Sequence, residues 1–283
     1  MVLPGASFAD ANASLEDASF IILGIPFDRT ASFRSGARFA PNAIREASYN
    51  FETFLYEHEV DLLDIPIHDM GNLEEFGTVD EMVSSARMEL ESLVSRGRFP
   101  IVLGGEHSVT IPAVQSFEDI GVVSIDAHLD FRDEYLGGRN SHACVTHRIA
   151  DHVGIDNVVV LGVRSMSREE YESPRPEHID AAAIREMGIE RAVKEAIDIL
   201  DKDRIYLTVD IDGIDPSFAP GTGTPEPFGL SDVDVKKCID LLAPRLVGFD
   251  VVEVCPPFDN GNTSAMAARL VREAIATVWK TRD

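Results

Sequence analysis

The most informative stretch of this chain is Gly121-Val122-Val123-Ser124-Ile125-Asp126-Ala127-His128-Leu129-Asp130, an apolar run that leads into two acids and a histidine. Short runs rich in Val and Ile predict strands that are covered on both faces. Pro100–Leu103 is a second such run and leads into Gly104–His107. Ile205–Val209 is a third and leads into Asp210–Asp212. Because ligands bind at the carboxyl ends of parallel strands, we expect these acids and histidines at one edge of one sheet.

Short apolar runs and helical periodicity alternate along the chain. Strands are predicted over Phe20–Gly24, Phe99–Leu103, Gly121–Ile125, Asn157–Val163, Arg204–Val209 and Leu246–Val254, and helices over Thr78–Arg96, Glu190–Leu200, Ser231–Leu242 and Ser264–Lys280. This alternation predicts one α/β domain over residues 1–283, with a parallel sheet flanked by helices. An eight-stranded closed barrel is the alternative, because barrels also carry their sites at strand carboxyl ends. Phe131–Ala143 and Ile214–Leu230 are too irregular for helices and are expected to be loops beside the site.

Six potential metal ligands follow the predicted strands, namely His107, Asp126, His128, Asp130, Asp210 and Asp212. Carboxylates crowded in this way resist ionising together, and cations between them remove that penalty. Carboxylate oxygens with some imidazole suit Mn²⁺ better than Zn²⁺. The set matches two divalent ions that share carboxylates. In such sites the two ions lie about 3.5–4 Å apart. The sequence therefore predicts a site with two metals.

The composition limits the classes of partner. The formal net charge is −24, which argues against nucleic acid and anionic membranes as partners and suits a cationic ligand. No run of about 18 apolar residues predicts a transmembrane helix. Met1–Asp17 lacks the basic region of a secretory signal. The three cysteines, Cys144, Cys238 and Cys255, lack paired spacing, which indicates free thiols in a reducing cytoplasm.

The chain resembles the ureohydrolase family of arginases, agmatinases and their relatives. The matching segments are Gly24–Asp28, Ser35–Pro41, Gly104–Ser108, Asp126–Asp130, Ser141-His142, Asp210–Pro216, Gly221–Pro225 and Glu253. The resemblance covers nearly the whole chain. It implies a three-layer α/β/α sandwich with a mostly parallel open sheet, and a homotrimer or homohexamer.

The resemblance also implies how two Mn²⁺ ions are held in each subunit. His107 and Asp130 would hold one ion, His128 and Asp212 would hold the other, and Asp126 and Asp210 would bridge the two. The implied reaction is hydrolysis of a guanidino group to urea and an amine, by attack of a metal-bridged hydroxide.

Four further roles follow from the resemblance. His142 would protonate the leaving amine, and Glu253 would face the guanidinium group. Asp212 or its neighbours, with the metals, would stabilise the tetrahedral intermediate. The glycine-rich stretch Gly221–Glu226, which includes Thr224, would shape the wall of the active site and contact the substrate.

The loop Phe131–Ser141 departs from the arginase pattern and is closer to the agmatinase-like branch. Asp133 and Glu134 in this loop favour a cationic tail on the substrate. Agmatine, hydrolysed to putrescine and urea in polyamine biosynthesis, fits this charge, and aminopropylagmatine fits it too. Arg132 and Arg139 would instead suit a carboxylate tail, as in guanidinobutyrate or arginine.

Two other classes of protein remain as alternatives. A metal-dependent deacetylase of related fold would hold a single zinc ion, so metal content per subunit separates it from a two-metal site. A polyamine-binding pseudoenzyme would bind agmatine without releasing urea. All six predicted ligands are present, together with His142 and Glu253, which favours an enzyme.

Overall fold

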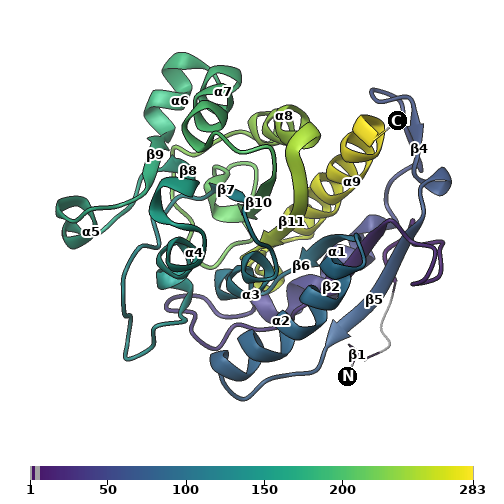
Figure 1. Ribbon diagram of the computed structural model, residues 1–283, viewed down its shortest axis with the longest axis horizontal. Coiled ribbons are helices and arrows are strands. Elements are labelled where there is room, and N and C mark those ends of the chain that lie inside the picture. The colour runs from purple at the N-terminus through teal and green to yellow at the C-terminus, as the bar shows by residue number, and fades with distance from the viewer. Residues whose placement is uncertain (1, 4–6, 283) are drawn as a thin grey trace.

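The computed structural model describes residues 2–3 and 7–282. Figure 1 shows a twisted central sheet with helices on both faces. Its strands are β1 (Val2–Leu3), β2 (Phe20–Gly24), β5 (Ile67–Leu73), β6 (Phe99–Leu103), β7 (Gly121–Ile125), β8 (Val158–Val163), β9 (Glu177–Asp180), β10 (Ile205–Asp210) and β11 (Leu246–Val252). They lie in the order β1-β5-β2-β6-β11-β10-β7-β8-β9, and every pair is parallel except β1 with β5. A separate ribbon joins β3 (Phe54–Leu55) to β4 (Val60–Asp61).

The helices form two layers around the sheet. They are α1 (Ala40–Ser48), α2 (Val79–Ser95), α3 (Thr110–Gln115), α4 (Val145–Val153), α5 (Arg168–Glu172), α6 (Ala181–Met187), α7 (Ile189–Leu200), α8 (Asp232–Leu242) and α9 (Asn262–Arg282). Helices α1, α9, α8 and α7 pack side by side in one layer, and α2, α3 and α4 form the other. Among the described residues, no helix combines the length and the hydrophobicity that a membrane span requires.

Alternate residues of each central strand enter two different cores. In β7, Val123 packs into the core under α7, α8 and α9, whereas Val122 packs into the core under α2, α3 and α4. Ile101 and Val102 of β6 divide in the same way. Because successive side chains of a strand point to opposite faces, a sheet covered on both sides needs the continuous apolar runs found in the sequence. The predicted three-layer α/β/α sandwich is confirmed, and the closed barrel is excluded by the open order of the strands.

The observed helix starts agree with those predicted from the sequence where the N-cap residues are strong. Thr78 and Ser231 both form capping boxes, with Glu81 and Asp234 respectively, at the starts of α2 and α8. The strand predicted to run to Val254 ends earlier, because Glu253 has a left-handed backbone (φ 61°).

Strand β5 and helix α1 were not predicted from the sequence, and they contact each other through polar groups. Strand β5 contains Asp69 and Asn72, polar residues that are more typical of loops. Both side chains accept hydrogen bonds from the buried guanidinium of Arg45 in α1. A tertiary ion pair therefore stabilises a strand that the local pattern does not reveal.

Candidate metal centre and active site

Four adjacent central strands, β6, β11, β10 and β7, carry the candidate site at their carboxyl ends. Val209 pairs with Ile125, and Val251 pairs with Leu103, so the four strands end at nearly one level. Gly105 allows the segment after β2 to cross close by, because a Cβ there would lie 1.9 Å from the backbone oxygen of Phe27. The residues after these strands therefore converge in space.

His107 faces three carboxylates. Its Nδ1 atom lies 3.2 Å from Asp126 Oδ2, 3.4 Å from Asp130 Oδ2 and 3.2 Å from Asp210 Oδ2. Its other ring nitrogen, Nε2, lies 3.2 Å from the hydroxyl of Thr208. When Nε2 donates to Thr208, Nδ1 is left as the ligand atom, an arrangement typical of metal-bound histidines.

His128 faces a second set of carboxylates. Its Nδ1 atom lies 3.1 Å from Asp212 Oδ2 and 3.6 Å from Asp126 Oδ1. Ligand atoms of His107, Asp126 and Asp130 form one compact group, and those of Asp126, His128 and Asp212 form another. The structure thus brings all six sequence-predicted ligands together, and Asp126 belongs to both groups.

The electrostatics of these groups fit divalent cations. Burial, together with Asp212 and Asp126, raises the pKa of Asp210 well above its ordinary value. Burial opposes protonation of His107, but its three carboxylate neighbours outweigh this effect and raise its pKa well above 6.5. Buried Asp126 Oδ2 and His107 Nδ1 lie 3.2 Å apart without the geometry of a hydrogen bond, and neither atom has another hydrogen-bond partner among the described residues. Two cations would satisfy these atoms and relieve the carboxylate repulsion.

A third group of potential ligands, His58, Asp240 and Glu273, lies away from this centre. Lys236 lies 3.2 Å from Asp240 and 3.7 Å from Glu273, and Arg269 pairs with Glu273 at 2.7 Å. These cations already balance the acids, so this cluster is an ion-pair network rather than a metal site.

The segment after β10 is fixed by Arg164, which follows β8. Its guanidinium donates hydrogen bonds to the backbone oxygens of Asp212, Gly213 and Glu226. Thr224 lies in the same segment and donates its hydroxyl proton to Asp212 Oδ2 over 2.8 Å. Thr224 therefore orients a candidate ligand and also lines the cavity.

Two side chains of the site stand on left-handed backbone. Asp130 has a φ of 49°, and Glu253 has a φ of 61°. Such conformations cost energy for residues other than glycine and cluster at functional sites. Glu253 is buried, and its Oε1 accepts a hydrogen bond from the backbone N–H of His107 over 2.8 Å. Burial and the neighbouring charge of Glu106 raise its pKa to about 8.

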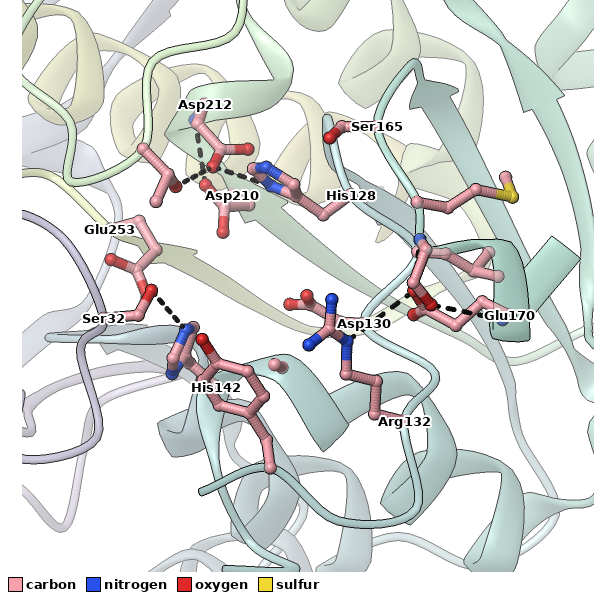
Figure 2. A pocket seen from close by; sticks show the side chains of 16 residues that line it. Ser32, His128, Asp130, Arg132, His142, Ser165, Glu170, Asp210, Asp212 and Glu253 are labelled. Atoms are coloured by element: carbon pink, nitrogen blue, oxygen red, sulfur yellow. Dashed lines mark hydrogen bonds and ion pairs between the residues drawn. The ribbon is translucent and has the colours of Figure 1, made fainter.

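A cavity of about 230 Å³ opens at these side chains. It is lined by Ser32, His128, Leu129, Asp130, Arg132, Tyr135, His142, Ala143, Ser165, Met166, Ser167, Glu170, Asp210, Asp212, Thr224 and Glu253. Figure 2 shows Glu253 and Glu170 on opposite sides of the cavity, with the ligand carboxylates between them.

His142 lines the cavity at the start of the segment that leads into α4. Its Nε2 atom lies 3.3 Å from Ser32 Oγ, and its Nδ1 atom lies 3.1 Å from Thr30 Oγ1. The rings of Tyr135 and His142 pack at nearly a right angle, with their centroids 5.5 Å apart. Burial lowers the pKa of His142 and so favours the neutral ring.

Asp133 and Glu134 do not line the cavity, although the sequence suggested that they meet the substrate tail. Asp133 is exposed and pairs with Arg139 and Arg148 at 2.7 Å and 2.6 Å. The side chain beside Asp133 in the sequence, Arg132, does face the cavity, stacks on Tyr135 and lies 3.8 Å from Glu170.

Glu170 is the main cavity residue that sequence reasoning missed. It is buried, and its two oxygens accept the backbone N–H groups of Phe131 and Ser167. Ser167 and Glu170 form a capping box at the start of α5, and the Ser-x-x-Glu pattern was the available signal. That pattern identifies a helix start but gives no sign that the helix meets the cavity.

Comparison with known proteins agrees with this geometry. The model of the arginase family matches residues 18–277. The chain belongs to the arginase family. An agmatinase of Pyrococcus horikoshii is 36% identical over 91% of this chain and 91% of its own length. An N(1)-aminopropylagmatine ureohydrolase of Thermococcus kodakarensis is 36% identical over 94% of this chain and 92% of its own.

A solved structure supports the same assignment. The agmatine ureohydrolase of Thermoplasma volcanium superposes on this arginase-family chain with a TM-score of 0.95 at 41% identity, covering 99% of this chain and 96% of the other. The resemblance to agmatinase-like ureohydrolases is thereby confirmed, and this arginase-family chain is a metal-dependent hydrolase. The arginase-family fold implies a binuclear metal site, and the two ligand groups that share Asp126 are its candidates here.

Proposed function

We propose that this arginase-family enzyme hydrolyses agmatine to putrescine and urea with two Mn²⁺ ions per subunit. The proposal is carried by one observation: the cavity places a buried carboxylate on each side of the metal-ligand groups, Glu253 on one side and Glu170 on the other. A substrate with a guanidinium at one end and an ammonium at the other matches such a cavity in charge.

Glu253 would bind the guanidinium end. Its Oε1 already accepts the N–H of His107, which leaves Oε2 to face the cavity. Because burial raises its pKa to about 8, a cationic substrate that arrives beside it would also favour its ionised form. A charge-assisted hydrogen bond then orients the guanidinium against the ligand groups.

Glu170 would bind the ammonium end. Each of its oxygens accepts one backbone N–H and retains a second lone pair. Its negative charge is only loosely matched by Arg132, whose Nε lies 3.8 Å away on a half-exposed side chain. Ser165 and Ser167 also line the cavity.

The six candidate ligands would hold the two cations, with Asp126 shared between them, in the arrangement that the family resemblance implies. When bound, the cations would polarise a water molecule for attack on the guanidinium carbon. Asp212 is held in place by the Thr224 hydroxyl, and Glu253 fixes the guanidinium plane. His142 Nε2 would take up a proton that the attacking water releases and deliver it to the departing amine of putrescine.

Arg132 favours a second candidate, a substrate with a carboxylate tail such as guanidinobutyrate, because its guanidinium lines the cavity. Urea release from agmatine, aminopropylagmatine, guanidinobutyrate and arginine by the Mn²⁺-loaded protein separates the candidates. We expect the highest kcat/KM with agmatine. A clear preference for guanidinobutyrate would assign the tail to Arg132, and binding of agmatine without urea release would indicate a pseudoenzyme.

A further inference from the structure

Glu106 is a fully buried carboxylate beside the candidate ligands that belongs to neither ligand group. Its Oε2 accepts the backbone N–H of Thr30 over 2.7 Å. Its Oε1 accepts the hydroxyl of Thr30 over 2.5 Å and the hydroxyl of Ser108 over 2.6 Å. Glu106 therefore holds both the backbone and the side chain of Thr30, which comes from the segment after β2.

The hydroxyl of Thr30 links Glu106 to His142 through hydrogen bonds. Thr30 Oγ1 accepts the backbone N–H of His142 over 3.0 Å and lies 3.1 Å from Nδ1 of the same ring. A threonine hydroxyl has one proton and two lone pairs. With its proton given to Glu106 and one lone pair given to the His142 N–H, only an acceptor position remains toward Nδ1. Nδ1 must then be the protonated nitrogen.

We propose that Thr30, anchored by Glu106, is a positioning residue that keeps the proton on Nδ1 of His142, so that Nε2 is the atom that exchanges a proton with the substrate. The inference rests on the proposed function for the role of His142, but the tautomer itself does not depend on it. Figure 2 shows Ser32 beside the His142 ring, where its hydroxyl meets Nε2. Ser32 can donate to an unprotonated Nε2 or accept from a protonated one, so it does not fix the tautomer.

The other groups around His142 do not fix which ring nitrogen carries the proton. The negative charges of Asp130 and Asp212 favour the protonated ring, whereas burial and the positive charges of His107 and His128 oppose it. Tyr135 packs against the ring in a T-shaped arrangement, and the hydrogen-bond partner of Nδ1 among the described residues is Thr30. Without the Thr30 hydroxyl, Nδ1 would have no acceptor among the described residues, and the proton would redistribute to Nε2.

The test compares Thr30→Val, which removes the hydroxyl at nearly constant volume, with Thr30→Ser, which restores it. Thr277→Val is the matched control, because among the described residues the buried Thr277 hydroxyl bonds only backbone oxygens of its own helix, α9. Imidazole nitrogen shifts of ¹⁵N-histidine-labelled, zinc-loaded (diamagnetic) protein report the tautomer, with the His142 signal assigned from a His142→Asn variant. Thr30→Ala replaces Thr30→Val if the valine variant does not fold.

We expect the Nδ1-protonated tautomer in the wild type, Thr30→Ser and Thr277→Val, and a shift toward Nε2 protonation in Thr30→Val. For urea release by the Mn²⁺ enzyme, we expect Thr30→Val to lower kcat about tenfold or more with little change in KM, because a misplaced proton donor forfeits part of its contribution. The pH dependence of kcat should move with it. An unchanged tautomer in Thr30→Val would overturn the proposal. If the tautomer shifts but no protein releases urea, the positioning role stands and the proposed function fails.

Discussion

Asp126 Oδ2 lies 3.2 Å from Nδ1 of His107, although the strands before them, β7 and β6, are separated in the sheet by β11 and β10. The contact is possible because both residues lie beyond their strands and turn over the ends of the two strands between. Asp126 reaches His128 with its other oxygen, at 3.6 Å. One carboxylate therefore joins the two halves of the candidate metal centre.

Metal binding should stabilise the protein more at alkaline than at acidic pH. The pKa values of His107, Asp130 and Asp210 are raised in the folded protein. In the metal-free protein, each such group contributes stability that is fully present below its pKa in the unfolded chain. This stability is lost as the pH rises through its pKa in the folded protein. Metals must displace these protons, so the rise in Tm on adding Mn²⁺ should be larger at pH ~8.5 than at pH ~6.

Thermal unfolding of chelator-treated protein with and without Mn²⁺ across this range measures the effect. An increment in Tm that is the same at both ends of the range, or larger in acid, would show that these groups do not bind the metal.

Removal of the His142 imidazole should slow the chemical step and leave metal binding intact. His142 lines the cavity without belonging to either ligand group. We expect His142→Asn to lower kcat by about 10²–10⁴-fold, the usual contribution of a general acid or base, with KM changed little. His178→Asn, at the edge strand β9, is the matched control and should keep full activity. A kcat within a few-fold of wild type would assign proton transfer to another group.

Neutralising Glu170 should weaken selection for a cationic tail. Glutamine at this position can keep the capping-box hydrogen bond of α5 through its one carbonyl oxygen, but it gives up the second hydrogen bond, from the backbone N–H of Phe131. We expect Glu170→Gln to reduce the ratio of kcat/KM for agmatine to that for guanidinobutyrate about tenfold, the value of one charged hydrogen bond. Glu172→Gln makes the same chemical change on the exposed face of α5 and should leave the ratio unchanged.

The same assay decides between Glu170 and the loop acids. If Asp133→Asn changed the ratio and Glu170→Gln did not, the loop would rearrange on substrate binding and release Asp133 from Arg148.

Gly105 is required by a close approach of two backbones. A Cβ at this position would lie 1.9 Å from Phe27 O, whereas one at Gly138 would find its nearest neighbour at 3.6 Å. Gly105→Ala should therefore lower the free energy of unfolding by about 1–3 kcal/mol, as other overpacked sites do, and Gly138→Ala by much less. Denaturant unfolding of both variants measures the difference, and equal stabilities would mean that the two segments separate freely.

The central strands and the candidate ligands could be predicted because both depend on local pattern. Buried parallel strands need continuous apolar runs, and the carboxyl end of such a strand has a known direction. Gly121–Ile125 was therefore correctly predicted as a strand. The acids after it lie, as expected, with the other candidate ligands at one edge of an open sheet.

The far end of the cavity could not be predicted because it depends on which way the side chains of one loop turn. Asp133 turns toward Arg148, and its neighbour Arg132 turns toward Glu170. Glu170 arrives from α5, some forty residues later in the sequence, and nothing in the local pattern links the two segments. The polar strand β5 was missed for the same reason, since its partner Arg45 lies in α1.

The number of metal ions per subunit tests the account most directly. Elemental analysis of protein loaded with Mn²⁺ and freed of excess should give two ions per chain for the wild type. Asp133→Asn should match it, and Asp126→Asn should hold fewer than one tightly bound ion, because Asp126 belongs to both ligand groups. One ion per wild-type chain, or full occupancy of both positions in Asp126→Asn, would contradict a two-metal centre joined by this carboxylate.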